Sequence, residues 1–259
     1  MKTLVLDFDG VIADSQMECL FVGFNAYLEF NKGTKLFDGR KFTFDNFDFL
    51  AQKHRKAVEQ YKALRPYVID AFCYYVIAYI LENNIAVKGQ NEYNDLRKKL
   101  AKGIYVDFVE RFYSERIRLI DSNINGWLGL VKPYEKIIPA IKMLDGKFDL
   151  AISTNNRKFT IDAFSKKHGL NPRIVFDSSF GSDKKVHIEN IHNEFGANFD
   201  EMHFVDDQIR NFAGVLPLKV HCYLATWGYN TKKQHEEAKK LGAVLVNQSN
   251  FYSTLLKGL

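Results

Sequence analysis

The stretch Leu4-Val5-Leu6-Asp7-Phe8-Asp9-Gly10 joins a short apolar run to two carboxylates and a glycine. An apolar run that ends in a Gly-containing loop is typical of a buried strand. Asp7 and Asp9 are separated by one residue at the strand end, so both can face the same small volume. Like charges this close repel unless a cation lies between them or one carries a proton. This arrangement suits a covalent nucleophile beside a proton donor with a divalent metal, although calcium loops and turns also use Asp-X-Asp-Gly.

Length and composition are those of a globular protein. The 259 residues suffice for one large domain or for a core domain with an insertion, and the 22 Phe and 13 Tyr predict well-filled cores. The net charge of +5 includes no basic tract beyond pairs such as Lys98-Lys99 and Lys239-Lys240. A nucleic-acid-binding protein usually has a concentrated basic stripe, so no nucleic acid partner is predicted. The mild positive excess is compatible with small anionic substrates.

Cysteine usage and hydropathy predict a soluble, cytoplasmic protein. Cys19, Cys73 and Cys222 are far apart and show neither metal-type spacing nor a disulfide framework, which fits a reducing compartment. The apolar stretch before Asp7 is too short for a signal peptide. The most lipid-like run, residues 71–81, is too short to span a bilayer, so no membrane partner is expected.

The chain has two textures. Residues 1–9 and about 145–259 alternate short apolar runs with amphipathic stretches, which is typical of a parallel α/β sheet. The predicted strands are residues 3–6, 150–153, 174–176, 202–205, 220–224 and 244–246. The predicted helices between them include residues 158–168, 185–194 and 232–241.

The intervening part of the chain, residues 16–130, contains helical stretches and no convincing strand. The predicted helices are residues 16–30, 46–64, 67–82 and 92–120, with breaks at Arg65-Pro66 and Asn83-Asn84. Parallel sheets place ligands outside the carboxyl ends of their strands, which is where this insertion begins. We therefore expect residues 16–130 to form a helical cap, a lid that selects substrate. Residues 1–15 and 131–259 would form the α/β catalytic core.

Three further segments place polar residues at the ends of predicted strands. In Ser153-Thr154-Asn155-Asn156, a hydroxyl and backbone N–H groups can hold a phosphate oxygen, although an ordinary helix cap is the alternative. Asp183-Lys184-Lys185-Val186-His187 offers a lysine that can neutralise both carboxylate and phosphate. Asp206-Asp207 places two adjacent carboxylates at a strand end, which is costly without a cation or a network of donors.

In this order, the four segments resemble the motifs of the haloacid dehalogenase superfamily, in its phosphoglycolate-phosphatase-like branch. Residues 7–15 resemble the opening motif almost residue for residue. The matches to the second, third and fourth motifs are Thr154 and Asn155, then Lys185-Val186-His187 as a form of Lys-Pro-His, then Asp206 and Asp207 with Asn211. Residues 226–229, Thr-Trp-Gly-Tyr, resemble a late segment of that branch. The resemblance covers the core well and the cap only by position and helical character.

The sequence departs from the family pattern at several positions. Val205 replaces a glycine that often precedes the metal-binding Asp, and Arg210 stands where many relatives have another acid. How Asp206 and Asp207 share the metal therefore stays open. Lys184 and Lys185 compete for the third motif, and the following Val-His and the expected helix register favour Lys185.

The resemblance implies a Rossmann-like parallel sheet with helices on both faces and an inserted all-helical cap. It also implies a Mg²⁺-dependent phosphatase that hydrolyses a small phosphorylated metabolite through an aspartyl-phosphate on Asp7, with Asp9 as general acid and base. The implied phosphate-binding residues are Thr154, Asn155 and Lys185, and the implied metal ligands are Asp7, the Asp9 backbone carbonyl, Asp206 and Asp207. A phosphomutase is the alternative, and a non-catalytic binding protein is less favoured because all four motifs carry competent residues. Substrate identity and oligomeric state stay open.

Some polar and aromatic residues near these motifs have more ordinary interpretations. Asp14 and Ser15 are predicted to cap the first helix of the insertion. His187 is predicted to support the local turn. Trp227 and Tyr229 are expected to pack at an edge of the sheet.

Overall fold

The computed structural model describes residues 1–257, and the chain divides into two compact units. The first, here called the α/β unit, consists of Met1–Asp14 and the described residues from Lys132 onward. The second, the helical unit, consists of Ser15–Val131.

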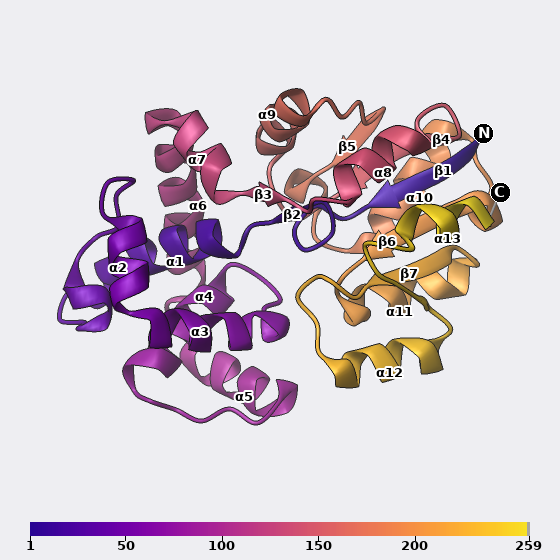
Figure 1. The fold of residues 1–259 in the computed structure, drawn as a ribbon. Helices are drawn as coiled ribbons and strands as arrows, with labels where there is room; N and C mark the ends of the chain where they lie inside the picture. The colour runs from indigo at the N-terminus through magenta and orange to yellow at the C-terminus, as the bar shows by residue number, and fades with distance from the viewer. Residues whose placement is uncertain (258–259) are drawn as a thin grey trace. The chain divides into compact units, whose positions relative to one another are not determined.

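Six parallel strands form the sheet of the α/β unit, in the order β5-β4-β1-β6-β7-β8 (Figure 1). The central strand β1 (Lys2–Leu6) pairs with β4 (Phe148–Ser153) and β6 (Met202–Asp206). The remaining strands are β5 (Ile174–Phe176), β7 (His221–Ala225) and β8 (Val244–Val246). The prediction of a parallel α/β sheet is confirmed, and each of the six predicted strands is present within about two residues of its predicted ends.

Helices cover both faces of this sheet. The helices in chain order are α8 (Ile137–Leu144), α9 (Lys158–His168), α10 (Lys184–Phe195), α11 (Phe212–Val215), α12 (Lys232–Leu241) and α13 (Phe251–Lys257). Val5 belongs to one buried cluster with side chains of α10, α11 and α12. Leu4 points the opposite way, because neighbouring strand residues alternate, and lines a small cavity with Ile141 and Leu144 of α8. Burial on both faces explains why the strands read as continuous apolar runs. The sequence had predicted α9 and α12 with their observed ends.

A two-stranded antiparallel ribbon marks the two points where the chain crosses between units. It consists of β2 (Ala13–Asp14) and β3 (Lys132–Pro133), with Ala13 opposite Pro133 and Asp14 opposite Lys132. Both strands belong to the α/β unit. We refer to this pair of strands as the ribbon.

The helical unit contains more breaks than the sequence predicted. Its helices are α1 (Gln16–Phe30), α2 (Phe47–Lys53), α3 (Arg55–Leu64), α4 (Phe72–Glu82), α5 (Gln90–Leu100), α6 (Tyr105–Ser122) and α7 (Ile124–Leu130). The predicted helix 92–120 is two helices, interrupted at Gly103, whose φ of 81° is incompatible with a right-handed helix. The predicted helix 46–64 breaks at His54. A short 3₁₀ turn, Arg65–Tyr67, contains Pro66, and α4 begins only at Phe72.

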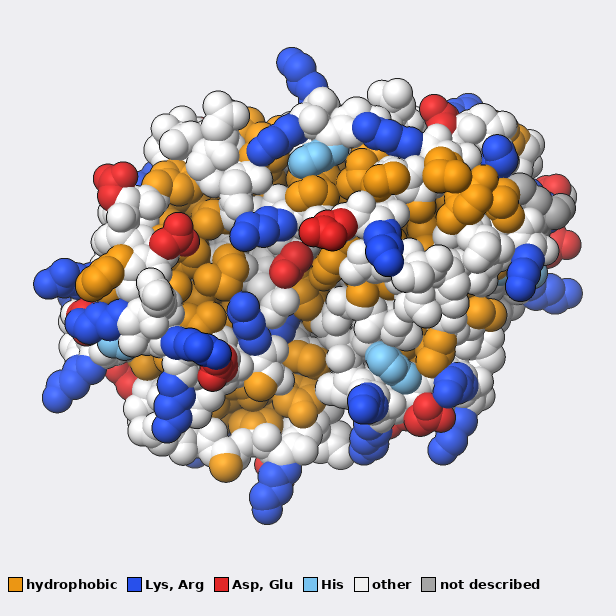
Figure 2. All heavy atoms as spheres, viewed as in Figure 1, with side chains coloured by type: hydrophobic (Ala, Val, Ile, Leu, Met, Phe, Trp, Pro, Cys, Tyr) orange, Lys and Arg blue, Asp and Glu red, His pale blue; other side chains and the backbone are white. Residues whose placement is uncertain are grey.

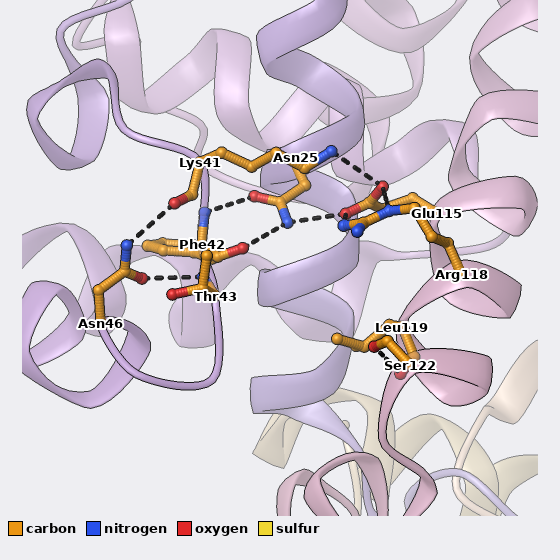
Figure 3. Close-up of polar contacts among 9 residues, drawn as sticks. All are labelled: Asn25, Lys41, Phe42, Thr43, Asn46, Glu115, Arg118, Leu119 and Ser122. Carbon is orange, nitrogen blue, oxygen red and sulfur yellow. Dashed lines mark hydrogen bonds and ion pairs between the residues drawn. The ribbon is translucent and has the colours of Figure 1, made fainter.

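A buried polar network joins α1 to α6 inside the helical unit (Figure 3). The Asn25 amide donates to Glu115 Oε1 at 2.9 Å and to the Phe42 carbonyl at 3.0 Å. Glu115 also accepts from Lys41 and Arg118, at 3.1 and 2.6 Å. Burial acts to raise the pKa of Glu115, but hydrogen bonds from Arg118, Asn25 and Lys41 hold it below its usual range. The glutamate is therefore a charged, fully engaged structural group.

The charged surface shows no concentrated basic region on the face in view. In Figure 2, Lys and Arg side chains are interspersed with Asp and Glu. Among the described residues, no helix is both long enough and apolar enough to cross a bilayer.

Candidate active site

Three buried aspartates of the α/β unit converge where β1 and β6 end. Asp7 follows β1 directly, and its N–H donates to the Val205 carbonyl of β6 at 2.9 Å. Asp7, Asp206 and Asp207 each offer a carboxylate oxygen, and these oxygens all lie within 4.8 Å of one another. The three residues are at most 8% exposed. Carboxylate oxygens are the ligands that hard divalent cations such as Mg²⁺ prefer, so this group is suited to hold one. Asp9 lies in the loop that follows β1 and pairs with Ala13 in an isolated β-bridge.

Burial has a large effect on Asp7. Loss of solvent raises the pKa of its carboxyl to about 6, Lys184 opposes that rise, and the nearby Asp206 charge adds to it. The Lys184 ammonium lies 2.9 Å from Asp7 Oδ1 and is itself buried. Lys184 thus pairs with one of three clustered carboxylates, and a bound cation would offset the repulsion among them.

The lysine at this site is Lys184, which corrects the choice of Lys185 made from the sequence. Lys185 has a side chain that is 46% exposed and lies 3.6 Å from Glu189 on the surface of α10. Asp183 caps α10 by accepting from the Lys185 N–H, so Lys184 is the first helical residue. Successive helical residues point about 100° apart, and the buried positions of α10 are Lys184, His187, Ile188 and Ile191. That i, i+3, i+4, i+7 spacing was readable in the sequence and would have identified Lys184.

His187 and Ser153 fix the position of Lys184. The Ser153 carbonyl accepts from the Lys184 ammonium at 2.5 Å, while the Ser153 hydroxyl lies 2.9 Å from His187 Nδ1. His187 Nε2 lies 3.2 Å from the Gly181 carbonyl, which can only accept, so Nε2 carries the proton and Nδ1 accepts from the serine. Burial, with Lys184 nearby, lowers the pKa of His187 to about 4, so the ring is neutral at neutral pH. His187 supports the turn at Gly181, as expected, and also the end of β4.

Thr154 and Asn155 follow β4 and lie in the turn before α9. Thr154 is buried, its N–H donates to the Phe176 carbonyl, and its hydroxyl accepts from the Asn156 N–H at 3.0 Å. The alternative interpretation, a helix cap at Thr154 or Asn155, is wrong, because α9 is capped at Arg157 and the Thr154 hydroxyl accepts within the preceding turn. Asn155 Oδ1 is buried and accepts no hydrogen bond from the described residues.

Each aspartate of the adjacent pair has its own donors. Asp206 accepts from the Gln208 N–H at 2.7 Å and from the Asn211 amide at 2.8 Å. Asp207 accepts from the Tyr229 N–H at 2.5 Å and from the Gln208 amide at 3.3 Å. These donors reduce the cost of burying two neighbouring carboxylates.

Gly10 packs directly against Asp207. Its φ is 85°, and a Cβ added there would lie 2.3 Å from Asp207 Oδ2. Any other residue would be strained in this conformation and would also collide with the carboxylate. The glycine of the first motif thus allows the loop after β1 to approach the aspartates of β6.

Ser15 does not make the predicted side-chain cap of α1, and Tyr229, which is buried as predicted, also makes a polar contact. The Ser15 side chain makes no capping hydrogen bond to α1, and Asp14 lies in β2. The Tyr229 hydroxyl donates to Asp14 Oδ1 at 3.0 Å. This pairing joins residues 215 apart in the chain, so no local pattern could have predicted it.

Comparison with known proteins identifies the fold. No family model matches the sequence, and none of the curated proteins searched matches it. The chain is similar in structure to a haloacid dehalogenase-like hydrolase from Streptococcus pneumoniae, at 12% identity and a TM-score of 0.59, covering 95% of this chain and 93% of that one. It is similar to a predicted phosphoglycolate phosphatase from Haemophilus somnus, at 12% identity, a TM-score of 0.59 and 98% coverage of both chains. A protein from Thermotoga maritima, provisionally assigned as a β-phosphoglucomutase, matches over 100% of both chains at 16% identity and a TM-score of 0.54. The chain therefore has the Rossmann-like α/β fold with a helical insertion that these proteins share.

Proposed function

We propose that this protein is a Mg²⁺-dependent phosphatase that hydrolyses a small phosphorylated metabolite through an aspartyl-phosphate on Asp7. The observation that carries the proposal is the buried group of Asp7, Asp206 and Asp207 with Lys184 at the end of β1. A nucleophilic carboxylate, a cation-binding group and a positively charged donor in one small volume suit phosphoryl transfer.

The donor set fits Mg²⁺. Asp7, Asp206, Asp207 and the Asp9 backbone carbonyl would hold the ion, which supplies positive charge that polarises the phosphoryl group. All four are oxygen donors, and the three carboxylates lie within 4.8 Å of one another, close enough to share one cation.

The residues of this chain divide the chemical work. An Asp7 oxygen attacks phosphorus, and the bond to the leaving oxygen breaks as Asp9 gives that oxygen a proton. Asp9 then takes a proton from the water that attacks the acyl-phosphate, which releases phosphate and regenerates Asp7. Lys184, the Thr154 hydroxyl and the Asn155 N–H stabilise the phosphoryl oxygens as charge spreads over them.

The structural neighbours support phosphoryl chemistry and also set the alternative. Two carry the descriptions hydrolase and phosphoglycolate phosphatase, and the third that of a phosphoglucomutase. A mutase would use the same aspartates but return the phosphoryl group to another position of the same sugar. Incubation with a hexose 1-phosphate and its bisphosphate activator separates the two, because a mutase yields an isomer and a phosphatase yields inorganic phosphate.

We assign substrate selection to the helical unit and place the protein in the cytoplasm. The helical unit is inserted directly after the first strand and its loop, next in sequence to the proposed nucleophile. Cys19, Cys73 and Cys222 are buried thiols that are not joined in disulfides, which suits a reducing compartment.

The test is a panel of phosphorylated metabolites assayed with Mg²⁺ and with EDTA. We expect Mg²⁺-dependent phosphate release from at least one small monoester, and none from Asp7→Asn. Asp149→Asn is the matched control. Asp149 is equally buried, but it lies near the start of β4 and pairs with Arg173. Retained turnover in Asp7→Asn would refute the covalent mechanism.

A further inference from the structure

Tyr229 connects two parts of the α/β unit through different atoms. Its backbone N–H donates to Asp207 Oδ2, and its carbonyl accepts from the Gln208 amide at 2.7 Å. Its hydroxyl donates to Asp14 Oδ1 in the ribbon at 3.0 Å. The residue is only 4% exposed. Tyr229 therefore contacts Asp207 through its backbone and Asp14 of the ribbon through its buried side chain.

The loop around Tyr229 has little room to move independently of Asp207. A Cβ added to Gly228 would lie 2.3 Å from Asp207 Cβ and 2.5 Å from the Gly10 carbonyl. The Asn230 amide donates to the Asp207 carbonyl at 3.0 Å. Residues 227–230 are thus packed tightly against Asp207, so a shift of Asp207 also shifts this loop.

The same loop also contacts the segment that leads into the ribbon. Trp227 Nε1 donates to the Val11 carbonyl at 3.1 Å, three residues before Asp14. Asp14 pairs with Lys132 across the ribbon, so it joins the two strands through which the chain leaves and re-enters the α/β unit. Asp207 is therefore linked through Tyr229 and Asp14 to both strands of the ribbon.

We propose that Tyr229 is a positioning residue that couples cation binding at Asp207 to the order of the ribbon at Asp14. The inference rests on the proposed function, in which Asp207 contributes to the Mg²⁺ site. A carboxylate held by a cation fixes the Tyr229 N–H in one position, and the phenol then holds Asp14 in place. Because such coupling is reciprocal, loss of the Tyr229–Asp14 bond weakens Mg²⁺ binding.

The test compares Tyr229→Phe with Tyr223→Phe. Each variant deletes one hydroxyl from a tyrosine that is at most 6% exposed. The Tyr223 hydroxyl bonds His203 Nδ1 at 2.9 Å within the sheet rather than the ribbon, so its loss controls for a deleted buried hydrogen bond. Calorimetric titration with Mg²⁺ alone measures affinity, and hydrogen exchange of residues 11–15 and 131–134, with and without Mg²⁺, measures the ribbon.

In wild type and Tyr223→Phe, we expect Mg²⁺ to slow exchange in the ribbon. In Tyr229→Phe, Mg²⁺ should no longer slow exchange at residues 13–15 and 131–134, although the Trp227–Val11 bond persists, and it should bind about fivefold or more weakly, at the lower end of coupling between linked sites. Asp14→Ala should weaken Mg²⁺ binding similarly, and the double variant should lose no more than either single one.

The outcomes separate this inference from the proposed function. If wild-type protein hydrolyses a monoester with Mg²⁺ and Tyr229→Phe matches Tyr223→Phe in affinity and exchange, only the coupling is overturned. If wild-type protein binds no Mg²⁺, the proposed function and the coupling are both overturned.

Discussion

The two units bury charge in opposite ways. In the helical unit, Glu18 and Arg116 form a bidentate pair at 2.7 and 2.8 Å, and both residues are at most 6% exposed. This pair matches opposite charges one to one. In the α/β unit, three buried carboxylates, of Asp7, Asp206 and Asp207, lie within 4.8 Å of one another, and the Lys184 ammonium pairs with Asp7.

This difference separates structural charge from functional charge. A balanced buried pair is complete by itself, and its removal leaves an uncompensated charge. An unbalanced group costs stability until a ligand completes it, which is why perturbed carboxyls gather at functional sites. Neutralising one member of a balanced pair should lower the free energy of unfolding. Neutralising one carboxylate of the unbalanced group should raise it.

The largest effect is expected for Arg116→Met in the helical unit. It leaves Glu18 buried without its cation and should cost about 3–5 kcal/mol in urea unfolding. Arg118→Met is the control on the same helix, because the Arg118 side chain is 56% exposed and Glu115 keeps Lys41 and Asn25 as partners. It should cost about 1 kcal/mol or less. Equal losses in the two variants would contradict a balanced structural pair at Glu18.

Lys184→Met should remove the positive charge of the α/β site. We expect kcat/KM to fall about a hundred- to thousandfold, as when one electrostatic donor to a transition state is lost. Lys185→Met should stay close to wild type, because that side chain faces solvent and Glu189. The reverse ranking in a steady-state assay would return the role to Lys185.

The choice between these lysines shows how far the sequence can be read. Asp7 and the Asp206-Asp207 pair were predictable because each follows an apolar strand, and ends of parallel strands meet at one edge. The lysine lies on a helix, where an error of one residue rotates the side chain by about 100°. The hydrogen bond from Ser153 to His187 joins residues 34 apart, and the choice of tautomer depends on the Gly181 carbonyl.

The helical unit was less readable for a different reason. Apolar spacing predicts its helices, but it predicts one helix over 92–120 where the structure has α5 and α6. The break comes from the positive φ of Gly103, which lies inside a periodic stretch and leaves no signal in the spacing. Glu18 and Arg116 lie 98 residues apart, so their pairing depends on how α1 packs against α6. The sequence alone could not distinguish Arg116, which is buried and paired with Glu18, from Arg55, which is exposed.

Asp7→Asn should test the unbalanced group directly. The folded-state pKa of Asp7, about 6, is raised from 3.8, so the ionised side chain costs stability above pH 6 and costs none below about pH 4. In EDTA at pH 8, Asp7→Asn should be about 1–3 kcal/mol more stable than wild type, and the difference should vanish by pH 4.

The matched variant in the helical unit is Glu18→Gln, for which we expect destabilisation under the same conditions. Mg²⁺ at a hundredfold excess over its dissociation constant should add about 2.7 kcal/mol to the wild type. It should add little to Asp7→Asn. A destabilised Asp7→Asn in EDTA would show that the Lys184 contact outweighs burial and repulsion, and the contrast between the units would fail.

The smallest effect concerns acid stability of the α/β unit. His203 on β6 is buried, and burial with the nearby His221 and Lys2 charges lowers its pKa to about 4. The unfolded chain binds a proton below about pH 6.5 and the folded chain does not. Stability is therefore present above pH 6.5 and is lost as the pH falls toward 4.

His203→Gln should flatten this loss by about 1–2 kcal/mol, since His187, with a pKa also near 4, still contributes. His54→Gln, at a partly exposed site in the helical unit, should keep the full wild-type slope. The chain has two tryptophans, Trp127 in the helical unit and Trp227 in the α/β unit. In a Trp127→Phe background, Trp227 emission then reports unfolding of the α/β unit alone. If His54→Gln and His203→Gln flatten that transition equally, acid sensitivity does not reside in the sheet. Protonation of the buried His203 would then not explain the loss of stability of the α/β unit in acid.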